Sequence, residues 1–168
     1  MAKQSAGILL YKQDGADLKL LLAHPGGPFW ASKDAGVWSI PKGEYGTDEP
    51  PLAAALREFT EETGLPLNPK HYLDLGEVKL KSGKVIKAWG VEGDFKTDKL
   101  VSNRFTTEWP PHSGTEQSFP EIDRAEWFDP ATAIVKINPS QQIFIDRLLE
   151  QLGIDPAGIS PPEQAALL

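Results

Sequence analysis

The chain has 168 residues, 40% of them hydrophobic, which is enough for one compact domain with a single core and leaves little room for a second. It contains no cysteine, so disulfides and thiolate metal ligands are excluded, and any metal would be bound by oxygen or imidazole. The formal net charge of −7 argues against a broad grip on a nucleic-acid backbone, but not against a small phosphorylated substrate held through divalent cations.

No segment indicates export or membrane insertion. The residues after Met1 do not combine a basic start with an apolar run, and no stretch approaches the roughly 20 apolar residues that a membrane helix needs. We therefore expect a cytoplasmic protein without membrane contact. The sequence does not indicate an oligomeric state.

The first 40 residues predict a hairpin followed by a shaped loop. Apolar runs at 4–12 and 18–23 flank Asp14-Gly15, a turn signal that predicts two antiparallel strands. The glycines and prolines of HPGGP, at the start of 24–36, predict a loop. A short strand is expected at 37–40.

A helix over residues 51–63 is the clearest predicted element. Thr47 or Asp48 is placed near its N-cap, Pro51 suits its first turn, and Gly64 is a typical residue just past a helix end. Beyond it, segments 76–80 and 84–93 flank Ser82-Gly83 and predict a second hairpin.

The stretch 94–120 is expected to be irregular. Loops of this length usually either carry function or lack order, so we keep it as a candidate for the substrate side of a site. A strand at 124–128, a short helix at 130–135 and an amphipathic helix at 139–152 complete the predicted elements.

Hairpins interspersed with helices favour α+β or α/β/α layering around a mixed sheet. The domain is expected to span residues 1–152, with 153–168 as a loosely ordered C-terminal tail.

The helix at 51–63 carries two unlike faces. Leu52, Ala55, Leu56 and Phe59 fall on one stripe, while Glu58, Glu61 and Glu62 fall on another. Glutamates three or four residues apart on a helix repel each other by about 0.2–0.5 kcal/mol per pair. Mg²⁺ would relieve this repulsion, because it takes carboxylate oxygens together with substrate phosphates. The alternative is a solvated acidic face with Arg57 in an ordinary helix ion pair.

Residues 43–65, GEYGTDEPPLAAALREFTEETGL, resemble the Nudix box. The family pattern is Gly, five residues, Glu, seven residues, Arg-Glu, an apolar residue, any residue, Glu-Glu, any residue, Gly and an apolar residue. Every specified polar or glycine position is met. Phe59 is the one soft match, because the family usually has an aliphatic residue there. WSIPK at 38–42 also resembles the strand that leads into the box, and the resemblance covers about residues 4–152.

The resemblance implies an α/β fold, the Nudix α/β/α sandwich with a mixed central sheet. It further implies an enzyme that uses Mg²⁺, or Mn²⁺ as a substitute, to hydrolyse a phosphoanhydride bond in a nucleoside diphosphate-linked substrate. Water is the expected nucleophile.

The resemblance also assigns roles within the box. One glutamate is expected to activate the attacking water, and Glu49 is expected to support the loop and helix through Arg57, unless it is a plain surface carboxylate. The expected catalytic residues are Glu58, Glu61 and Arg57; the expected metal ligands are Glu58, Glu61 and Glu62; the structural positions are Gly43, Glu49 and Gly64.

Candidate site residues also lie outside the helix. Glu121, six residues before Trp127, resembles in spacing the loop glutamate that completes the metal site in the antimutator branch, and Glu116 is its rival. Lys42 is expected to bind substrate phosphate or to offer its carbonyl to the metal, and Gln141 is a candidate for reading the base. For these residues, a solvated side chain or an unremarkable helix-start residue is the alternative.

The nucleoside part of the substrate is open. By overall resemblance we expect a dinucleoside polyphosphate or a nucleoside triphosphate, including oxidised forms. An RNA 5′ end and ADP-ribose are the alternatives, and no other nucleic-acid partner is expected. Neither the Pro nor the Tyr that marks two family branches is present at 80–83. A hypothesis of another class is a domain that senses a nucleotide without hydrolysing it.

Loop aromatic residues could either stack a base or anchor their loops to the core: Phe29, Trp30, Phe105, Trp109 and Phe119. The three histidines show no metal-binding or catalytic spacing and are expected in loops or on the surface: His24, His71 and His112.

Overall fold

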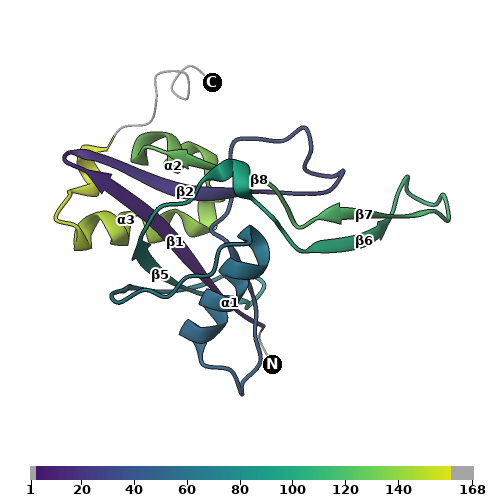
Figure 1. Ribbon diagram of the computed structural model, residues 1–168, viewed down its shortest axis with the longest axis horizontal. Helices are drawn as coiled ribbons and strands as arrows, with labels where there is room; N and C mark the ends of the chain where they lie inside the picture. Colours follow the sequence, from purple (N-terminus) through teal and green to yellow (C-terminus); the bar gives the residue numbers. More distant parts are fainter. Residues whose placement is uncertain (1–2, 160–168) are drawn as a thin grey trace.

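The computed structural model describes residues 3–159 and shows a three-layer α/β/α sandwich around a mixed sheet (Figure 1). The sheet strands are β1 (Gln4–Asp14), β2 (Asp17–Pro25), β3 (Lys42–Glu44), β4 (Leu73–Lys79), β5 (Val85–Glu92) and β8 (Ile122–Phe128). The α-helices are α1 (Pro51–Thr63), α2 (Pro130–Lys136) and α3 (Gln142–Gln151). Short 3-10 turns are η1 (Thr97–Lys99), η2 (Pro139–Gln141) and η3 (Pro156–Gly158). The predicted fold class is confirmed.

The strand order is β4-β5-β1-β2-β8, with β1 and β5 parallel and the other pairs antiparallel. β3 pairs antiparallel with the start of β1, at residues 5–7. The two predicted hairpins are therefore present, β1–β2 and β4–β5. β4 begins three residues before its predicted start, at Leu73, and contains a register shift between Asp74 and Glu77.

Alternating residues of β1 feed two separate cores. Ile8 and Leu10 pack with Phe59 of α1 on one face of the sheet. Leu9 and Tyr11 pack with α3 residues such as Phe144 on the other face. Because successive side chains of a strand point to opposite faces, the continuous apolar run at 6–11 in β1 is what a sheet covered on both sides requires.

The prediction of a strand at 37–40 is wrong. Trp38 and Ser39 make only isolated bridges, to Ile137 and Ala23. The Ile40 amide donates to the Gln141 side chain, 3.0 Å away. These backbone groups are satisfied by three different segments rather than by one neighbouring strand, and the regular pairing begins later, in β3.

The N-cap of α1 is Pro50, two or three residues after the Asp48 and Thr47 that were expected near it. The helix begins after Pro50, whose side chain makes no capping hydrogen bond, so neither Thr47 nor Asp48 caps it. Pro51 occupies the first turn and Gly64 ends the helix with a φ of 84°, both as predicted. A φ in that region favours glycine, because other residues acquire a Cβ clash there.

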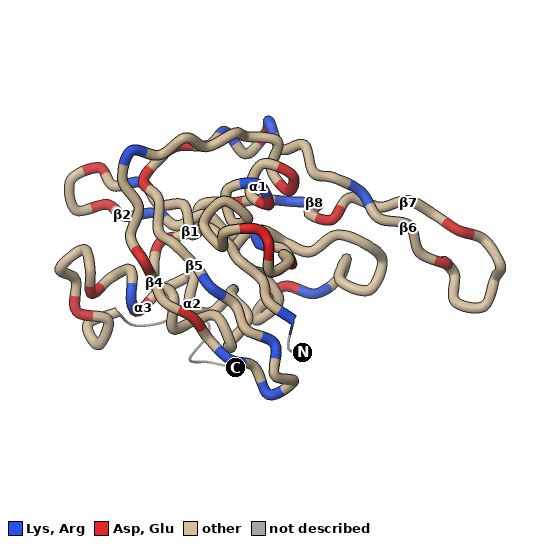
Figure 2. Tube along the Cα trace, turned by 90° about the horizontal axis from the view of Figure 1, so that it is seen from below, with Lys and Arg blue, Asp and Glu red and all other residues tan. Residues whose placement is uncertain are grey.

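The stretch 94–120 is not irregular. After η1 it forms a hairpin of β6 (Arg104–Glu108) and β7 (Glu116–Pro120), in a two-stranded sheet of its own. The hairpin projects from the body of the domain in two perpendicular views (Figures 1 and 2). Its strands are mostly polar and largely exposed, so they lack the apolar runs that predicted the core strands.

The C-terminal part differs slightly from the predicted helix at 139–152. The segment starts with η2, continues as α3 and reaches its C-cap at Leu152. Ile154 and Ile159 pack against the core on the α3 side. Residues 160–168 of the predicted tail lie outside the described residues, so the domain boundary at 152 stays a prediction. Among residues 3–159, no helix has the length and apolarity to cross a membrane.

Phe59 anchors α1 to the sheet, so its truncation should cost stability. Its side chain is completely buried, and Phe59→Ala should lower the free energy of unfolding by about 3–5 kcal/mol through lost burial and a cavity. Ile143→Ala, at a partly exposed apolar position, should change it by only about 0.5 kcal/mol. Urea denaturation would check both values, and equal losses would contradict this account of the core.

Candidate active site

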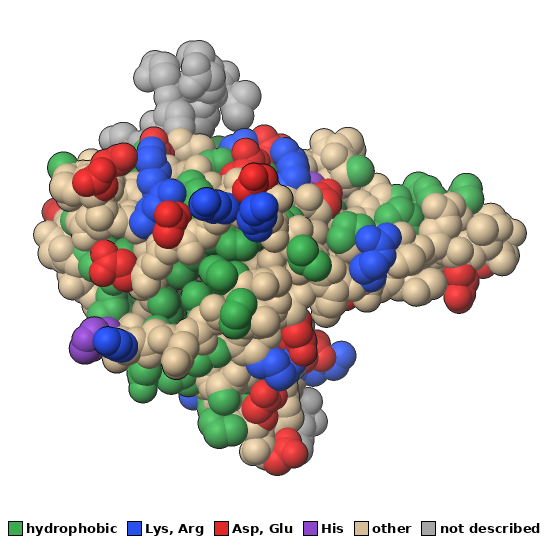
Figure 3. All heavy atoms as spheres, in the orientation of Figure 1, with side chains coloured by type: hydrophobic (Ala, Val, Ile, Leu, Met, Phe, Trp, Pro, Cys, Tyr) green, Lys and Arg blue, Asp and Glu red, His purple; other side chains and the backbone are tan. Residues whose placement is uncertain are grey.

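The acidic face of α1 is set by the packing of its apolar face. Ala54, Ala55 and Phe59 are buried against the sheet. The helical period then turns Glu58, Glu61 and Glu62 away from that core. Figure 3 shows acidic and basic side chains side by side at the lower end of α1.

Arg57 binds three carboxylates at once. Its Nε and Nη2 donate to the two carboxylate oxygens of Glu49, at 2.8 and 2.9 Å. Its Nη1 donates to Glu58 Oε1 at 2.9 Å and to Glu61 Oε2 at 3.1 Å. The fork to Glu49 lowers the pKa of that carboxyl and, with the other glutamates, raises the pKa of Arg57. The predicted support of the helix by Glu49 through Arg57 is seen directly in these contacts.

Gly43 leaves room for the Glu58 carboxylate. A Cβ at position 43 would lie 2.0 Å from Glu58 Cδ, far inside contact distance. β3 therefore passes directly under this carboxylate. Burial raises the pKa of Glu58, and the nearby charge of Glu61 adds to the shift against the opposing hydrogen bond from Arg57.

Glu62 is the most strongly perturbed group of the cluster. Burial raises its pKa to about 8, and the charges of Glu58 and Glu121 add to this rise. The charge of Lys42 opposes it, as does the Lys42 backbone N–H, which donates to Glu62 Oε1 at 3.4 Å. Burial in turn lowers the pKa of Lys42. Lys42 thus lies at the predicted site, facing a carboxylate.

Glu121 lies directly after β7, and its exposed side chain belongs to the same neighbourhood because its charge contributes to the pKa of Glu62. Its N–H donates to Asn103 O at 2.8 Å, and its carbonyl accepts from Gly26 N at 2.8 Å. Glu116 begins β7, five residues earlier, which is roughly 16 Å along an extended strand. The geometry therefore favours Glu121 over Glu116.

The donor set fits a hard divalent cation, although the side chains do not converge. Within residues 3–159, no three acidic or histidine side chains lie close enough together to hold a metal ion. Arg57 draws Glu58 and Glu61 to itself, and Glu62 points to the Lys42 amide. All the candidate ligands are carboxylates, the ligand type that Mg²⁺ prefers. Burial raises the pKa of the Glu62 carboxyl to about 8, so this group would take its charged form at neutral pH only beside a counter-ion, which a bound cation would supply.

Gln141 is not available to read a base. Its side chain is 3% exposed. Its Oε1 accepts from the Ile40 amide at 3.0 Å, and its Nε2 donates to Ser39 Oγ at 3.0 Å. A base could bind it only by leaving the Ile40 amide unpaired, so this expectation disagrees with the structure, and Gln141 holds the segment leading into β3.

His24 is buried in β2, which corrects the loop or surface position expected for it. Its Nδ1 lies 2.7 Å from Asp123 Oδ1, and its Nε2 lies 2.7 Å from the Lys33 carbonyl oxygen. The sequence held no signal for this pairing, because His24 and Asp123 are 99 positions apart. The pair fastens the loop at 26–36 to β2 and β8.

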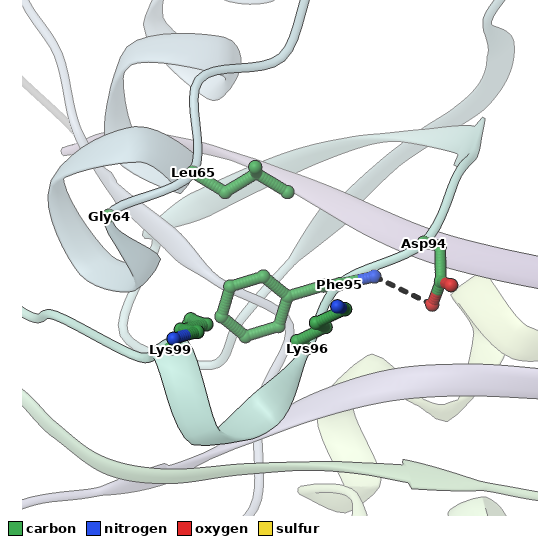
Figure 4. Close-up of a pocket in the computed structure, with 6 residues that line it drawn as sticks. All are labelled: Gly64, Leu65, Asp94, Phe95, Lys96 and Lys99. Carbon is green, nitrogen blue, oxygen red and sulfur yellow. Dashed lines mark hydrogen bonds between the residues drawn. The ribbon is translucent and has the colours of Figure 1, made fainter.

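A pocket of about 330 Å³ opens at the C-terminal end of α1 (Figure 4). Leu65 and Phe95 face each other across it, and Lys96 and Lys99 lie on the η1 side. Of the residues predicted for the site, only the structural Gly64 lines it. The acidic cluster and this pocket are therefore separate features.

Comparisons with known proteins agree with the geometry. A family model described as NUDIX domain matches residues 1–148. The RNA pyrophosphohydrolase of Gluconacetobacter diazotrophicus is 28% identical over 139 residues, which cover 76% of this chain and 77% of that protein. The RNA pyrophosphohydrolase of Stenotrophomonas maltophilia strain K279a is 37% identical over 75 residues, or 44% of this chain, but the match spans only 30% of that protein.

Solved structures share the fold. The C. elegans Ap4A hydrolase binary complex superposes with a TM-score of 0.60 at 18% identity, covering 89% of this chain and 98% of that one. The NUDIX domain of Shewanella oneidensis NrtR, complexed with ADP ribose, gives 0.60 at 17% identity, with 90% and 89% covered. A MutT/nudix family protein from Enterococcus faecalis gives 0.54 at 19% identity over 77% of this chain, which spans 44% of that protein.

Gly43→Ala should displace the Glu58 carboxylate. The new Cβ would overlap Glu58 Cδ, so the apparent affinity for Mg²⁺ should fall about tenfold or more, as when a metal ligand loses its support. Titration calorimetry would measure it. Gly158→Ala is the matched control, because nothing lies within 4 Å of a Cβ there. Unchanged Mg²⁺ affinity in Gly43→Ala would rule out a ligand role for Glu58.

Mg²⁺ affinity should depend on pH through Glu62. The metal-free protein holds a proton on this carboxyl below its pKa of about 8, and a cation must displace that proton. The apparent affinity should therefore fall about tenfold for each pH unit below 8. Calorimetry between about pH 6 and pH 8 would show the slope, and Glu62→Gln should flatten it. A pH-independent affinity in the unmodified protein would be the contrary result.

Proposed function

This chain belongs to the Nudix family, and from that membership we propose that it hydrolyses a phosphoanhydride bond in a nucleoside diphosphate-linked substrate with the help of Mg²⁺. The observation that carries the proposal is the network in which Arg57 binds Glu49, Glu58 and Glu61 beside the buried Glu62. Three carboxylates around one guanidinium, with a fourth buried nearby, repel one another, and this arrangement suits a site that takes up cations with its substrate.

Each residue of the cluster has a part in the reaction. Bound to Glu58, Glu61, Glu62 and Glu121, Mg²⁺ would supply charge neutralisation for the phosphate oxygens. Glu58 or Glu61 accepts a proton from the attacking water. The water oxygen bonds to phosphorus as the bridging P–O bond breaks, and the bonding electrons leave with the departing phosphate. Arg57 holds Glu58 and Glu61 in place, and the Lys42 ammonium offsets negative charge.

Two substrate classes have support. A dinucleoside polyphosphate or a nucleoside triphosphate is favoured by the fold shared with the C. elegans Ap4A hydrolase. A 5′-triphosphorylated RNA end is favoured by the relatives named RNA pyrophosphohydrolase. The net charge of −7 gives little attraction for an RNA body, so in that case contact would be limited to the 5′ end.

A sensor that binds a nucleotide without hydrolysing it is the alternative of another class. Structures of Shewanella oneidensis NrtR complexed with ADP ribose and with a 27mer DNA are examples of a Nudix fold in a DNA-bound protein. Here Arg57 and the three box glutamates are all present and in mutual contact or close proximity, which favours an enzyme.

A substrate panel with Mg²⁺ tests the proposal. The panel contains diadenosine polyphosphates, nucleoside triphosphates with oxidised guanine forms, ADP-ribose and triphosphorylated RNA, with product analysis to locate the broken bond. At least one substrate should be cleaved, and chelation should stop cleavage. Glu58→Gln and Glu61→Gln should each lower kcat by about 10²–10⁴-fold. Glu150→Gln, an exposed position on α3, is the control. Full activity in both active-site variants would refute the assignment.

A further inference from the structure

One face of the β6–β7 hairpin is aromatic. Phe105 and Phe119 are directly opposite in the strand register, with ring centroids 6.0 Å apart. Trp109, directly after β6, lies on the same face as Phe105, because side chains an even number of residues apart along a strand point to the same side. A lone two-stranded ribbon is marginally stable, so this face needs a covering layer.

The loop at 26–36 supplies part of that layer. The Phe29 ring meets Trp109 edge to face, with centroids 5.4 Å apart and an interplanar angle of 75°. Gly27 lies against the tip of Phe105, since a Cβ there would be 2.7 Å from Phe105 Cζ. Even so, Phe29 remains 61% exposed and Trp30 remains 40% exposed. We call Phe29, Trp30 and Trp109 the aromatic clamp, and Figure 3 shows hydrophobic side chains open to solvent along the hairpin.

Both arms of the clamp are held in place by hydrogen bonds. His24 Nε2 lies 2.7 Å from the Lys33 carbonyl oxygen, and Trp38 Nε1 donates to Asp34 Oδ1 at 2.8 Å, which fixes the far end of the loop. On the hairpin, Gln117 Nε2 donates to the Trp109 backbone carbonyl at 2.9 Å. Ordered aromatic rings lose little entropy on binding, so such arms suit recognition better than free loops do.

The clamp is continuous with the acidic site. Asn103, just before β6, donates its N–H to the Glu61 carbonyl at 2.8 Å, and its own carbonyl accepts from the Glu121 N–H. The Glu121 carbonyl accepts in turn from Gly26, at the root of the loop. One ladder of backbone bonds thus joins α1, the base of the hairpin and the loop. This ladder therefore connects the acidic face of α1 with the two segments that carry the clamp.

We propose that the aromatic clamp stacks against the nucleobase of a nucleotide whose phosphates lie at α1, an inference that rests on the proposed function. Exposed aromatic faces stack on bases of any identity, and an edge-to-face pair leaves ring faces free. Cations flank the path from clamp to site. Lys33 Nζ lies 5.1 Å from the Trp30 ring, and Arg104 is paired with Pro120, next to Glu121. The clamp thereby selects substrates that carry a base.

The clamp is tested by comparing the kinetics of a substrate that carries a nucleobase with those of a substrate that does not. Phe29→Ala and Trp30→Ala should raise KM for diadenosine tetraphosphate by about tenfold, the effect of losing an aromatic stacking partner, with kcat unchanged. KM for inorganic tripolyphosphate, which has no base, should not move. Trp109→Ala should behave like Phe29→Ala, and Trp109→Phe should restore KM, which separates stacking from collapse of the hairpin. Tyr72→Ala is the matched control, an aromatic residue 50% exposed just before β4.

Other outcomes overturn the proposal. Equal KM changes for both substrates would make the rings structural, and no change would leave them without a role in binding. A shift in oligomeric state without a KM change would assign the rings to contact between copies. If the unmodified protein hydrolyses nothing, the proposed function fails separately. Calorimetric binding of ATP with Mg²⁺ then decides the clamp, which stands only if Phe29→Ala weakens binding and Tyr72→Ala does not.

Discussion

The crowding of carboxylates on one helix face is the constraint on which the site depends. Glu58, Glu61 and Glu62 repel one another, and burial adds to the cost of charging Glu62. Arg57 offsets this locally by bonding Glu49, Glu58 and Glu61 together. Gly43 brings β3 close enough for the Glu58 carboxylate to rest on backbone. The box spacing thus places Arg57 and Gly43 where they reduce the repulsion among these carboxylates, and the proposed divalent cation would reduce it further.

The layers of the fold bring the rest of the site to that helix. The two-sided sheet fixes α1 through Phe59, and the segment before β6 runs back along the end of α1 to donate to the Glu61 carbonyl. This contact sets the base of the β6–β7 hairpin, and so the position of Glu121. A projecting hairpin and a rigid loop then extend the site outward (Figure 1). In the proposed function, phosphate chemistry and base recognition are divided between the helix and the hairpin.

Local patterns predicted the elements whose stabilising contacts are local. The β1–β2 hairpin, α1 and its Gly64 end follow from periodicity and turn residues. The failures involve distant partners. Residues 37–40 bond to three separate segments, and His24 meets Asp123 across 99 positions. Gln141 looks like an ordinary helix-start residue until its burial is known. Spacing therefore identified the acidic cluster, but not the contacts that surround it.

The central claim, that the α1 carboxylates together with Glu121 bind a divalent cation, is tested most directly by paramagnetic broadening with Mn²⁺. The account predicts that substoichiometric Mn²⁺ broadens the amide resonances of Glu58, Glu61, Glu62 and Glu121 first. It predicts that signals from the pocket around Phe95, beyond the end of α1, persist longer. Broadening centred on that pocket, or spread evenly over the acidic surface of the protein, would contradict it.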